Sequence, residues 1–219
     1  PANSSAYSYL AESFSARKQE PGLAAKVEAL VTPRVSEPLA VLMGGQVFLV
    51  MNQQDKARDL YEKHLAAKPG STLILNNLAN LYADRYKQLD RAVELARKAR
   101  ALEPSAPAVA DTLGWILYQK KDYKEALPLL EEAAKSMSGN AEVQYHFGMV
   151  NLRLGQAEPA ASALQRAVSS PVEFPGKDEA KSELADVLRA CTDFATDAGS
   201  PELIPADAAG FVPYDCVVL

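Results

Sequence analysis

Residues 108–135 are AVADTLGWILYQKKDYKEALPLLEEAAK, and residues 142–168 are EVQYHFGMVNLRLGQAEPAASALQRAV. The two stretches place matching small and large residues 34 positions apart. The matching residues are Leu113-Gly114 with Phe147-Gly148, Ala126 with Ala160, Leu130 with Leu164, and Ala133 with Ala167. A constant offset of this length indicates that the chain repeats one unit of supersecondary structure.

The same register continues upstream. Its residues are Leu78-Ala79, Tyr82, Ala92, Ala96, Ala99 and Pro104 in one repeat, with one extra residue around Lys87, and Gly45, Phe48, Ala57, Tyr61 and Pro69 in another. Leu10, Ala11 and Phe14 indicate a degenerate first repeat, whose second helix we expect at residues 23–31. We therefore expect repeats near residues 4–37 (degenerate), 38–71, 72–106, 107–140 and 141–170.

Helix packing explains this pattern. Apolar residues recur at spacings of three and four, which predicts one apolar stripe on each of two helices per repeat. Small residues at the eighth and twentieth positions of a repeat let the two helices approach closely. Turn residues such as Lys68-Pro69-Gly70 and Glu103-Pro104 fall where a helix should end. The pattern predicts an all-α fold in which helix pairs stack, because no pair can bury its stripe alone.

The last repeat of a stacked array needs a cover. Residues 177–195 predict one amphipathic helix with Ala180, Leu184, Val187, Leu188, Cys191 and Phe194 on one face. We interpret it as a capping helix that completes an array spanning residues 1–195. Residues 196–219 contain three prolines and show no helical period, so we expect an extended tail there.

The repeat pattern resembles the tetratricopeptide-repeat (TPR) family over roughly residues 4–170. The resemblance implies a right-handed α-solenoid, and a non-enzymatic scaffold that holds a polypeptide in a concave groove. Residues 75–79, residues 111–115 and Tyr145-His146 also resemble the C-terminal repeats of bacterial TPR proteins associated with exopolysaccharide export and PEP-CTERM sorting. That narrower resemblance implies an assembly role in the periplasm or at the outer membrane.

In the family, five positions of each first helix face the ligand. Carried onto this sequence, they give the predicted groove residues Leu42, Gln46, Leu49, Asn76, Asn80, Asp111, Trp115, Tyr118, Tyr145, Met149 and Arg153, with Val50, Asp84 and Leu152 beside them. Amide side chains can bond a peptide backbone, and large aromatic rings anchor interfaces. We expect the groove to hold an extended segment with apolar or aromatic side chains, including this chain's own tail or a neighbour's. Cationic residues that would grip a terminal carboxylate, as in co-chaperone members, are missing from the matching positions Ser8, Glu12, Asn77, Ala108 and Thr112.

Other roles for these residues remain open. Trp115 can be core between adjacent repeats, and Asn76 and Asn77 can bond neighbouring helices. Tyr145 and Met149 can cover the junction with the capping helix. Under each alternative, the side chain packs or bonds within the fold and does not contact a ligand.

Composition narrows the functional classes. The net charge of −5 and the pI near 5.2 disfavour nucleic acid as a partner, because phosphate binding needs an excess of Lys and Arg. The basic run from Lys87 to Arg100 is interpreted as a solvated helix face. The longest apolar stretch, residues 41–51, is far shorter than the roughly 20 residues of a membrane helix.

Recognisable catalytic and cofactor motifs do not stand out in this sequence. His64 and His146 lack a Cys or carboxylate at metal-ligand spacing, so we interpret both as structural. Gly44-Gly45 is attributed to close helix packing rather than to a phosphate loop. Cys191 and Cys216 can pair with each other, but the sequence does not decide whether they do. We expect no metal, no cofactor and no catalysis.

The favoured function is a protein-interaction scaffold in bacterial envelope exopolysaccharide or secretion assembly. A cytoplasmic regulatory adaptor and an accessory domain of a larger enzyme are the alternatives. The chain begins with Pro1 rather than Met, so we expect a processed chain or an excised domain. The sequence does not specify compartment, partner or oligomeric state.

Overall fold

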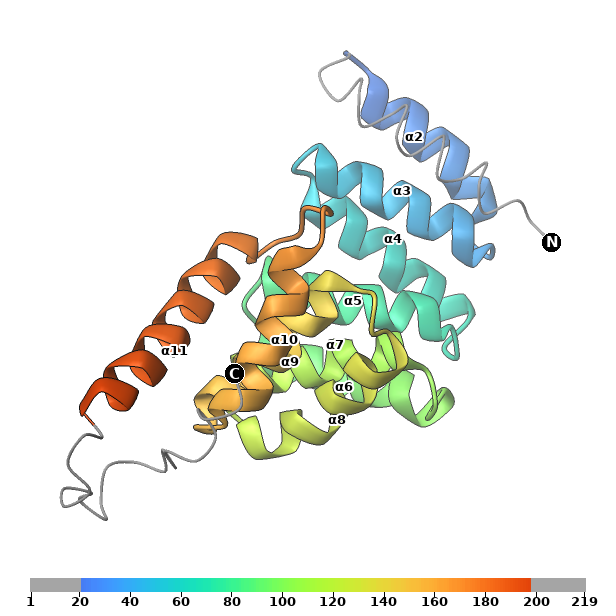
Figure 1. Cartoon of the computed structure of the whole chain (residues 1–219). Helices are drawn as coiled ribbons and strands as arrows, with labels where there is room; N and C mark the ends of the chain where they lie inside the picture. Colours follow the sequence, from blue (N-terminus) through green and yellow to red (C-terminus); the bar gives the residue numbers. More distant parts are fainter. Residues whose placement is uncertain (1–20, 198–219) are drawn as a thin grey trace. The chain divides into compact units, whose positions relative to one another are not determined.

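The computed structural model describes residues 21–197, with side chains described to residue 190, and these residues are helical apart from short connections (Figure 1). The helices are α2 (Leu23–Val31), the 3₁₀-helix η1 (Thr32–Arg34), α3 (Pro38–Val50), α4 (Gln54–Ala67), α5 (Thr72–Asp84), α6 (Leu89–Leu102), α7 (Pro107–Gln119), α8 (Tyr123–Ser136), α9 (Ala141–Arg153), α10 (Ala157–Ser169) and α11 (Lys177–Asp197). The described residues contain no strand, and the all-α prediction is confirmed. The helix expected around residues 10–14, the Cys191 and Cys216 side chains and the tail from residue 198 lie outside the description.

Contacts between residues divide the chain into two compact units, and the division falls inside α7. In the N-terminal unit (residues 1–112), α3 packs on α4, α5 packs on α6, and α3 also touches α5. In the C-terminal unit (residues 113–219), α9 packs on α10 and α8, and α11 lies against α10 and α9 (Figure 1). Within each unit, these helices thus bury their apolar stripes against neighbouring helices.

The first helices of the pairs begin at Pro38, Thr72, Pro107 and Ala141, where the sequence pattern places the repeat starts. Proline suits the first position of a helix, because its fixed φ is already helical and its missing N–H would have no partner there. Before α9, the Asn140 side chain accepts hydrogen bonds from the backbone N–H groups of Glu142 and Val143. Local sequence therefore sets where these helices start.

The turns inside the helix pairs share one geometry. Asn52, Lys87, Lys121 and Gly155 each have a positive φ, and each follows the first helix of its pair. The next residue's N–H bonds back to a carbonyl near the helix end, as from Asp122 to Leu117 and from Gln156 to Asn151, both at 2.9 Å. This left-handed cap satisfies carbonyls that the helix leaves unpaired. The extra residue around Lys87 lengthens this turn without changing its geometry. The Gln88 N–H bonds to the Tyr82 carbonyl, which lies one residue further back than the acceptor in the other turns.

Glycines on the first helices bring the paired helices together. A Cβ placed on Gly114 would lie 2.7 Å from Leu130 Cγ, and one placed on Gly148 would lie 2.7 Å from Leu164 Cγ. A Cβ on Gly45 would overlap the buried Tyr61 ring. A side chain larger than hydrogen would force the helices apart at all three positions, which confirms close packing as the reason for Gly45.

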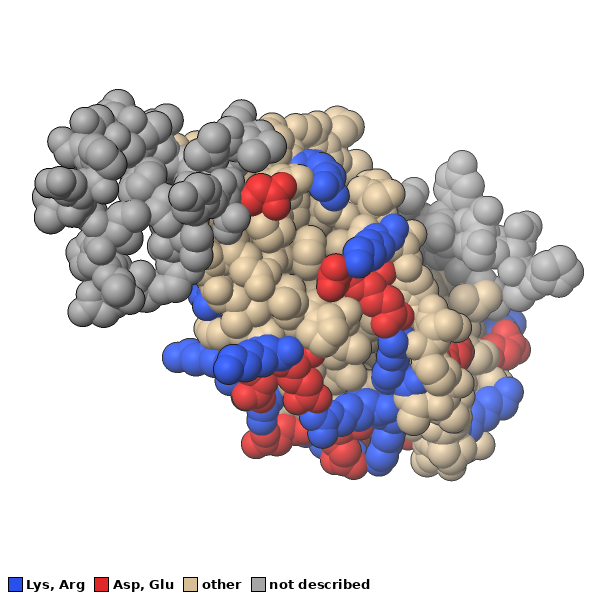
Figure 2. All heavy atoms as spheres, turned by 60° about the horizontal axis from the view of Figure 1, so that its bottom comes forward, with Lys and Arg blue, Asp and Glu red and all other residues tan. Residues whose placement is uncertain are grey.

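Charged side chains are mixed in sign on the surface. Figure 2 shows Lys and Arg side chains beside Asp and Glu side chains. On α6, Glu94 is bonded by Arg91 at 2.6 Å and by Lys98 at 2.9 Å, and these bonds lower the pKa of Glu94. The basic run on α6 is thus partly neutralised by its own helix. Within residues 21–197, no helix combines the length and the apolar character that crossing a membrane requires.

Replacing Gly45 by Ala should destabilise the protein by about 1–3 kcal/mol, because the new methyl group overlaps Tyr61 in a packed core. This cost exceeds the gain of about 1 kcal/mol that Ala brings to a helix. Urea unfolding followed by circular dichroism measures the change. The control is Gly70→Ala, because the side-chain atom nearest to its new methyl group, Leu102 Cδ2, would be 4.0 Å away. Equal stability of the two variants would contradict the packing role of Gly45.

Candidate functional site

In the N-terminal unit, the predicted groove residues occupy matching positions of two touching helices. Leu42 and Gln46 on α3 correspond to Asn76 and Asn80 on α5 at the repeat offset of 34. Leu49 follows Gln46 by one turn of α3. Gln46 is exposed and the other four are half-buried. We call these five residues the α3/α5 face, and its members carry no charge.

The asparagines near this face differ in how their side chains are bonded. Asn77 Nδ2 donates to Leu73 O of its own helix at 2.7 Å, rather than to a neighbouring helix. Asn80 Nδ2 lies 3.4 Å from Thr112 Oγ1 on α7, which is a long and weak bond. Asn76 Oδ1 is buried and accepts no hydrogen bond from the described residues. Asp111, the next predicted groove residue, is half-buried on α7.

In the C-terminal unit, aromatic rings from α7, α8, α9 and the connection before α11 pack together. Trp115 stacks on Tyr118, with ring centres 4.6 Å apart, and on His146, with ring centres 4.0 Å apart. The group, which we call the aromatic cluster, is Trp115, Tyr118, Tyr123, Tyr145, His146 and Phe174. Trp115 and Tyr118 are half-buried, so they join the core without being fully enclosed.

Two predicted groove residues are core residues instead. Tyr145 is 3% exposed and Met149 is 0% exposed. Both belong to a buried cluster with Ala180, Leu184 and Val187 of α11. The capping helix covers these first-helix residues, because it presents its apolar stripe to α9 as well as to α10. Their prediction as open groove positions is therefore corrected, and the alternative role at the junction with α11 holds.

The helix α11 also supplies two carboxylates that the sequence pattern did not single out. The Tyr145 hydroxyl donates to Glu179 Oε2 at 2.7 Å. Arg153, exposed on α9, lies 3.3 Å from both the Tyr118 hydroxyl and Glu183 Oε1. Glu179 and Glu183 are four residues apart, so they lie on one side of α11. Two glutamates spaced four residues apart, next to the apolar stripe of the predicted capping helix, were the feature of the sequence that could have indicated these contacts.

The connection before α11 fixes where the helix docks. Lys177 is buried, and its ammonium group donates to Ser170 O at 2.9 Å, to Val172 O at 3.2 Å and to Glu173. Gly176 has φ +92°, a backbone conformation that residues with a side chain rarely adopt. It also lies against the Tyr145 ring, with which a Cβ would clash. The loop and the tyrosine thus position each other.

The environment of the aromatic cluster shifts its phenols. Burial raises the pKa of Tyr145 well above its usual value, and the bond to Glu179 raises it further. Burial also raises the pKa of Tyr118, while Arg153 opposes that shift. Both phenols therefore stay protonated near neutral pH and act as hydrogen-bonding groups.

Two family models described as tetratricopeptide repeats match residues 78–142 and 117–171. The chain carries tetratricopeptide repeats. A Pseudomonas aeruginosa protein described as TPR repeat-containing protein PA4667 is 35% identical over 84 residues. The matched segment covers 38% of this chain and only 14% of that relative's length.

Solved TPR structures share the fold. PilW, described as a widely conserved type IV pilus biogenesis factor, matches with a TM-score of 0.68 at 17% identity, covering 90% of this chain and 93% of PilW. YrrB, described as a TPR protein with an unusual peptide-binding site, matches with a TM-score of 0.55 at 19% identity, covering 85% of this chain and 90% of YrrB. The likeness shows that the fold is that of the TPR solenoids.

The histidines of this TPR chain have packing roles. His64 is 0% exposed, and its Nδ1 lies 2.6 Å from Val35 O, so the protonated nitrogen donates to the carbonyl that precedes α3. His146 is buried against the Trp115 ring. Among residues 21–190, no three His, Cys, Asp or Glu side chains gather closely enough to hold a metal ion.

The bond between Tyr145 and Glu179 should be a measurable anchor of α11. We expect Tyr145→Phe to lower the free energy of unfolding by about 1.5–3 kcal/mol, because the Glu179 carboxylate loses the hydroxyl that donates to it. A double-mutant cycle with Glu179→Gln isolates the pair and should give a coupling energy of about 1 kcal/mol. Additive effects of the two substitutions would show that the hydroxyl does not bond this carboxylate in solution.

Proposed function

We propose that the chain is a protein-interaction scaffold that binds an extended polypeptide segment on the α3/α5 face. The observation that carries the proposal is the buried Asn76 Oδ1, which has no hydrogen-bond partner among the described residues. A buried acceptor without a partner costs about 1–3 kcal/mol. A backbone N–H of a bound segment can supply the missing bond.

The remaining residues of the face suit the same ligand. Leu42 and Leu49 are half-buried apolar side chains on either side of the exposed Gln46 amide. Among the residues that the structure describes, the Asn80 amide makes only the long contact to Thr112, so it can turn to a better acceptor. A face with apolar groups and amides but no charge matches an extended segment with uncharged side chains.

The aromatic cluster is proposed as a separate and smaller contact region. Trp115, Tyr118 and Arg153 keep exposed surface, whereas α11 covers Tyr145 and Met149. An exposed edge of a packed aromatic group is the kind of surface that anchors partners. The TPR fold supports a binding role, and YrrB, a structural neighbour, is described as having a peptide-binding site.

Asn76→Ala tests the proposal, because it should separate binding from stability. Removing an amide whose buried oxygen is unpartnered should leave the protein at least as stable as wild type, because the cost of that oxygen is removed with it. Losing its hydrogen bond to a ligand should weaken binding about 3–10-fold. The partner is first captured with a photo-crosslinking residue at the exposed Gln46, and a crosslinker at the exposed Lys98 on α6 is the control.

The captured segment is then synthesised, and its affinity for wild type and Asn76→Ala is measured by fluorescence anisotropy. Equal crosslinking from Gln46 and Lys98, or unchanged affinity of Asn76→Ala, would refute binding on the α3/α5 face.

The envelope setting is a further part of the proposal. It is supported by the resemblance of residues 75–79 and 111–115 to exopolysaccharide-associated TPR proteins. PilW, a structural neighbour, is itself described as a pilus biogenesis factor. Fractionation of cells that produce the full-length protein tests this setting, and recovery only with the cytoplasmic contents would favour the regulatory adaptor.

A further inference from the structure

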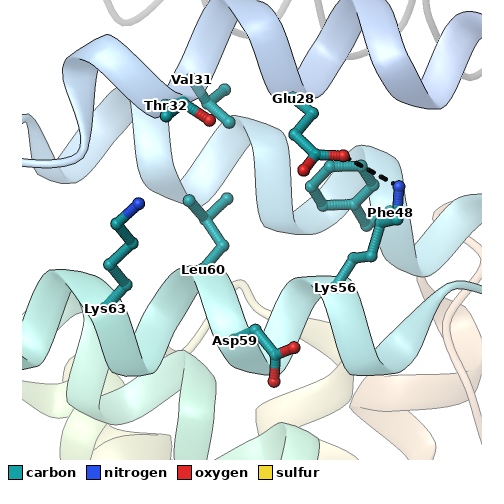
Figure 3. A pocket seen from close by; sticks show the side chains of 8 residues that line it. All are labelled: Glu28, Val31, Thr32, Phe48, Lys56, Asp59, Leu60 and Lys63. Carbon is teal, nitrogen blue, oxygen red and sulfur yellow. Dashed lines mark hydrogen bonds and ion pairs between the residues drawn. The ribbon is translucent and has the colours of Figure 1, made fainter.

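A pocket of about 340 Å³, which we call the α2/α4 pocket, lies between α2 and α4 (Figure 3). Its apolar lining is Val31 of α2, Phe48 of α3 and Leu60 of α4. In Figure 3, Leu60 stands between Lys56 and Lys63 on α4, and Val31 faces it from the end of α2. None of the lining residues belongs to the α3/α5 face, so the pocket is a separate feature of the N-terminal unit.

The charges around the pocket leave Lys63 for a ligand. Lys56 pairs with Glu28 at 2.9 Å. Asp59, which also lines the pocket, is bonded by Arg58 at 2.7 Å. Within the part of the chain that the structure describes, no carboxylate lies at ion-pair distance from the exposed Lys63. The α2/α4 pocket therefore suits an apolar side chain that has a carboxylate next to it.

The C-terminal unit presents such a pair of side chains between α10 and α11, in residues 170–176, which we call the Val172 loop. Val172 is 62% exposed, the largest exposed fraction of any large apolar side chain that the structure describes. The next residue is Glu173, whose side chain is 84% exposed. An apolar group and a carboxylate thus stand next to each other in solvent, which is the combination that the α2/α4 pocket suits.

Hydrogen bonds hold the backbone of the Val172 loop on both sides of the exposed side chain. The Val172 N–H donates to Ser170 Oγ at 3.2 Å, and the Val172 carbonyl accepts from the buried Lys177 ammonium, also at 3.2 Å. The same ammonium donates to Ser170 O and to Glu173 Oε1, both at 2.9 Å. A group that is fixed before it binds loses little conformational entropy on binding. The loop is therefore a preformed contact surface.

We propose that the Val172 loop of one copy of this chain binds the α2/α4 pocket of a second copy. Val172 is exposed in the chain that carries it, so the loop is available to another molecule. The Val172 side chain contacts the apolar lining of the pocket. Glu173 bonds Lys177 through Oε1 and offers Oε2 to the Lys63 ammonium of the second copy.

The pocket and the loop are different surfaces, so this contact is heterologous, and each pair of copies keeps one unoccupied pocket and one unoccupied loop. Copies therefore associate head to tail, into a ring or an open chain. One apolar side chain and one ion pair make a smaller contact than a stable interface does, so we expect a Kd on the order of 1 mM. This self-association is independent of the proposed segment binding, because it uses no residue of the α3/α5 face.

Mixing two forms of the chain tests the contact directly. The ¹⁵N-labelled chain carries Val172→Asp, which disables its own loop and keeps its pocket, and it is titrated with the unlabelled wild-type chain. Saturable amide shifts are expected at Val31, Phe48 and Leu60. Unlabelled Val172→Asp should cause no shifts there, whereas unlabelled Leu102→Asp, a matched change of another exposed apolar residue, should act as wild type does. Circular dichroism checks that each variant folds.

A second pair of variants tests the charge. Adding Lys63→Glu to the labelled chain should weaken binding of the wild-type chain about fivefold, whereas adding Lys124→Glu, exposed on α8, should leave the affinity unchanged. Three results would overturn the proposal: absence of shifts with the wild-type chain, equal shifts with wild type and Val172→Asp, or shifts at Leu42 and Asn76 of the α3/α5 face in place of the pocket.

Discussion

The contact between a glycine on a first helix and a large side chain on the second helix underlies the rest of the structure. At Gly114 and Gly148 the partner is a leucine at the same distance, and at Gly45 it is a tyrosine ring. Close approach places the helix backbones near enough to exclude water and bury both stripes. Because each pair buries its own seam, its outer surfaces remain for the neighbouring pair, and stacking follows.

The same rule accounts for the position of the proposed α3/α5 face. On the first helices, the packing residues face the second helix of the pair, which leaves Leu42, Gln46 and Asn76 on the other side. Among the described residues, Asn76 Oδ1 has no hydrogen-bond partner. Gly44 follows the same rule, because a Cβ there would lie 2.7 Å from a Val31 methyl group and 3.1 Å from a Leu60 methyl group.

Much of the fold could be predicted from the sequence, because helix starts and left-handed turns depend on local residues such as Pro38, Pro107 and Gly155. The start of α11 was also predictable, although its end at Asp197 lies two residues beyond expectation. The division of the chain into five repeats stays a prediction. The burial of Tyr145 and Met149 was not predictable from family positions, since it depends on how far α11 reaches over α9. The pocket lined by Val31, Phe48 and Leu60 depends on the positions of three helices, which local patterns do not specify.

The coupling between Gly148 and Leu164 tests the central claim most directly. Gly148→Ala is made in the wild-type chain and in Leu164→Ala, and urea unfolding gives the change in free energy in each background. In the wild type the methyl group should clash with Leu164 and destabilise the protein by about 1–3 kcal/mol. In Leu164→Ala the clash is gone. Gly148→Ala should therefore leave the stability of that variant unchanged, or raise it by up to about 1 kcal/mol through helix propensity. The same destabilisation in both backgrounds would contradict the account.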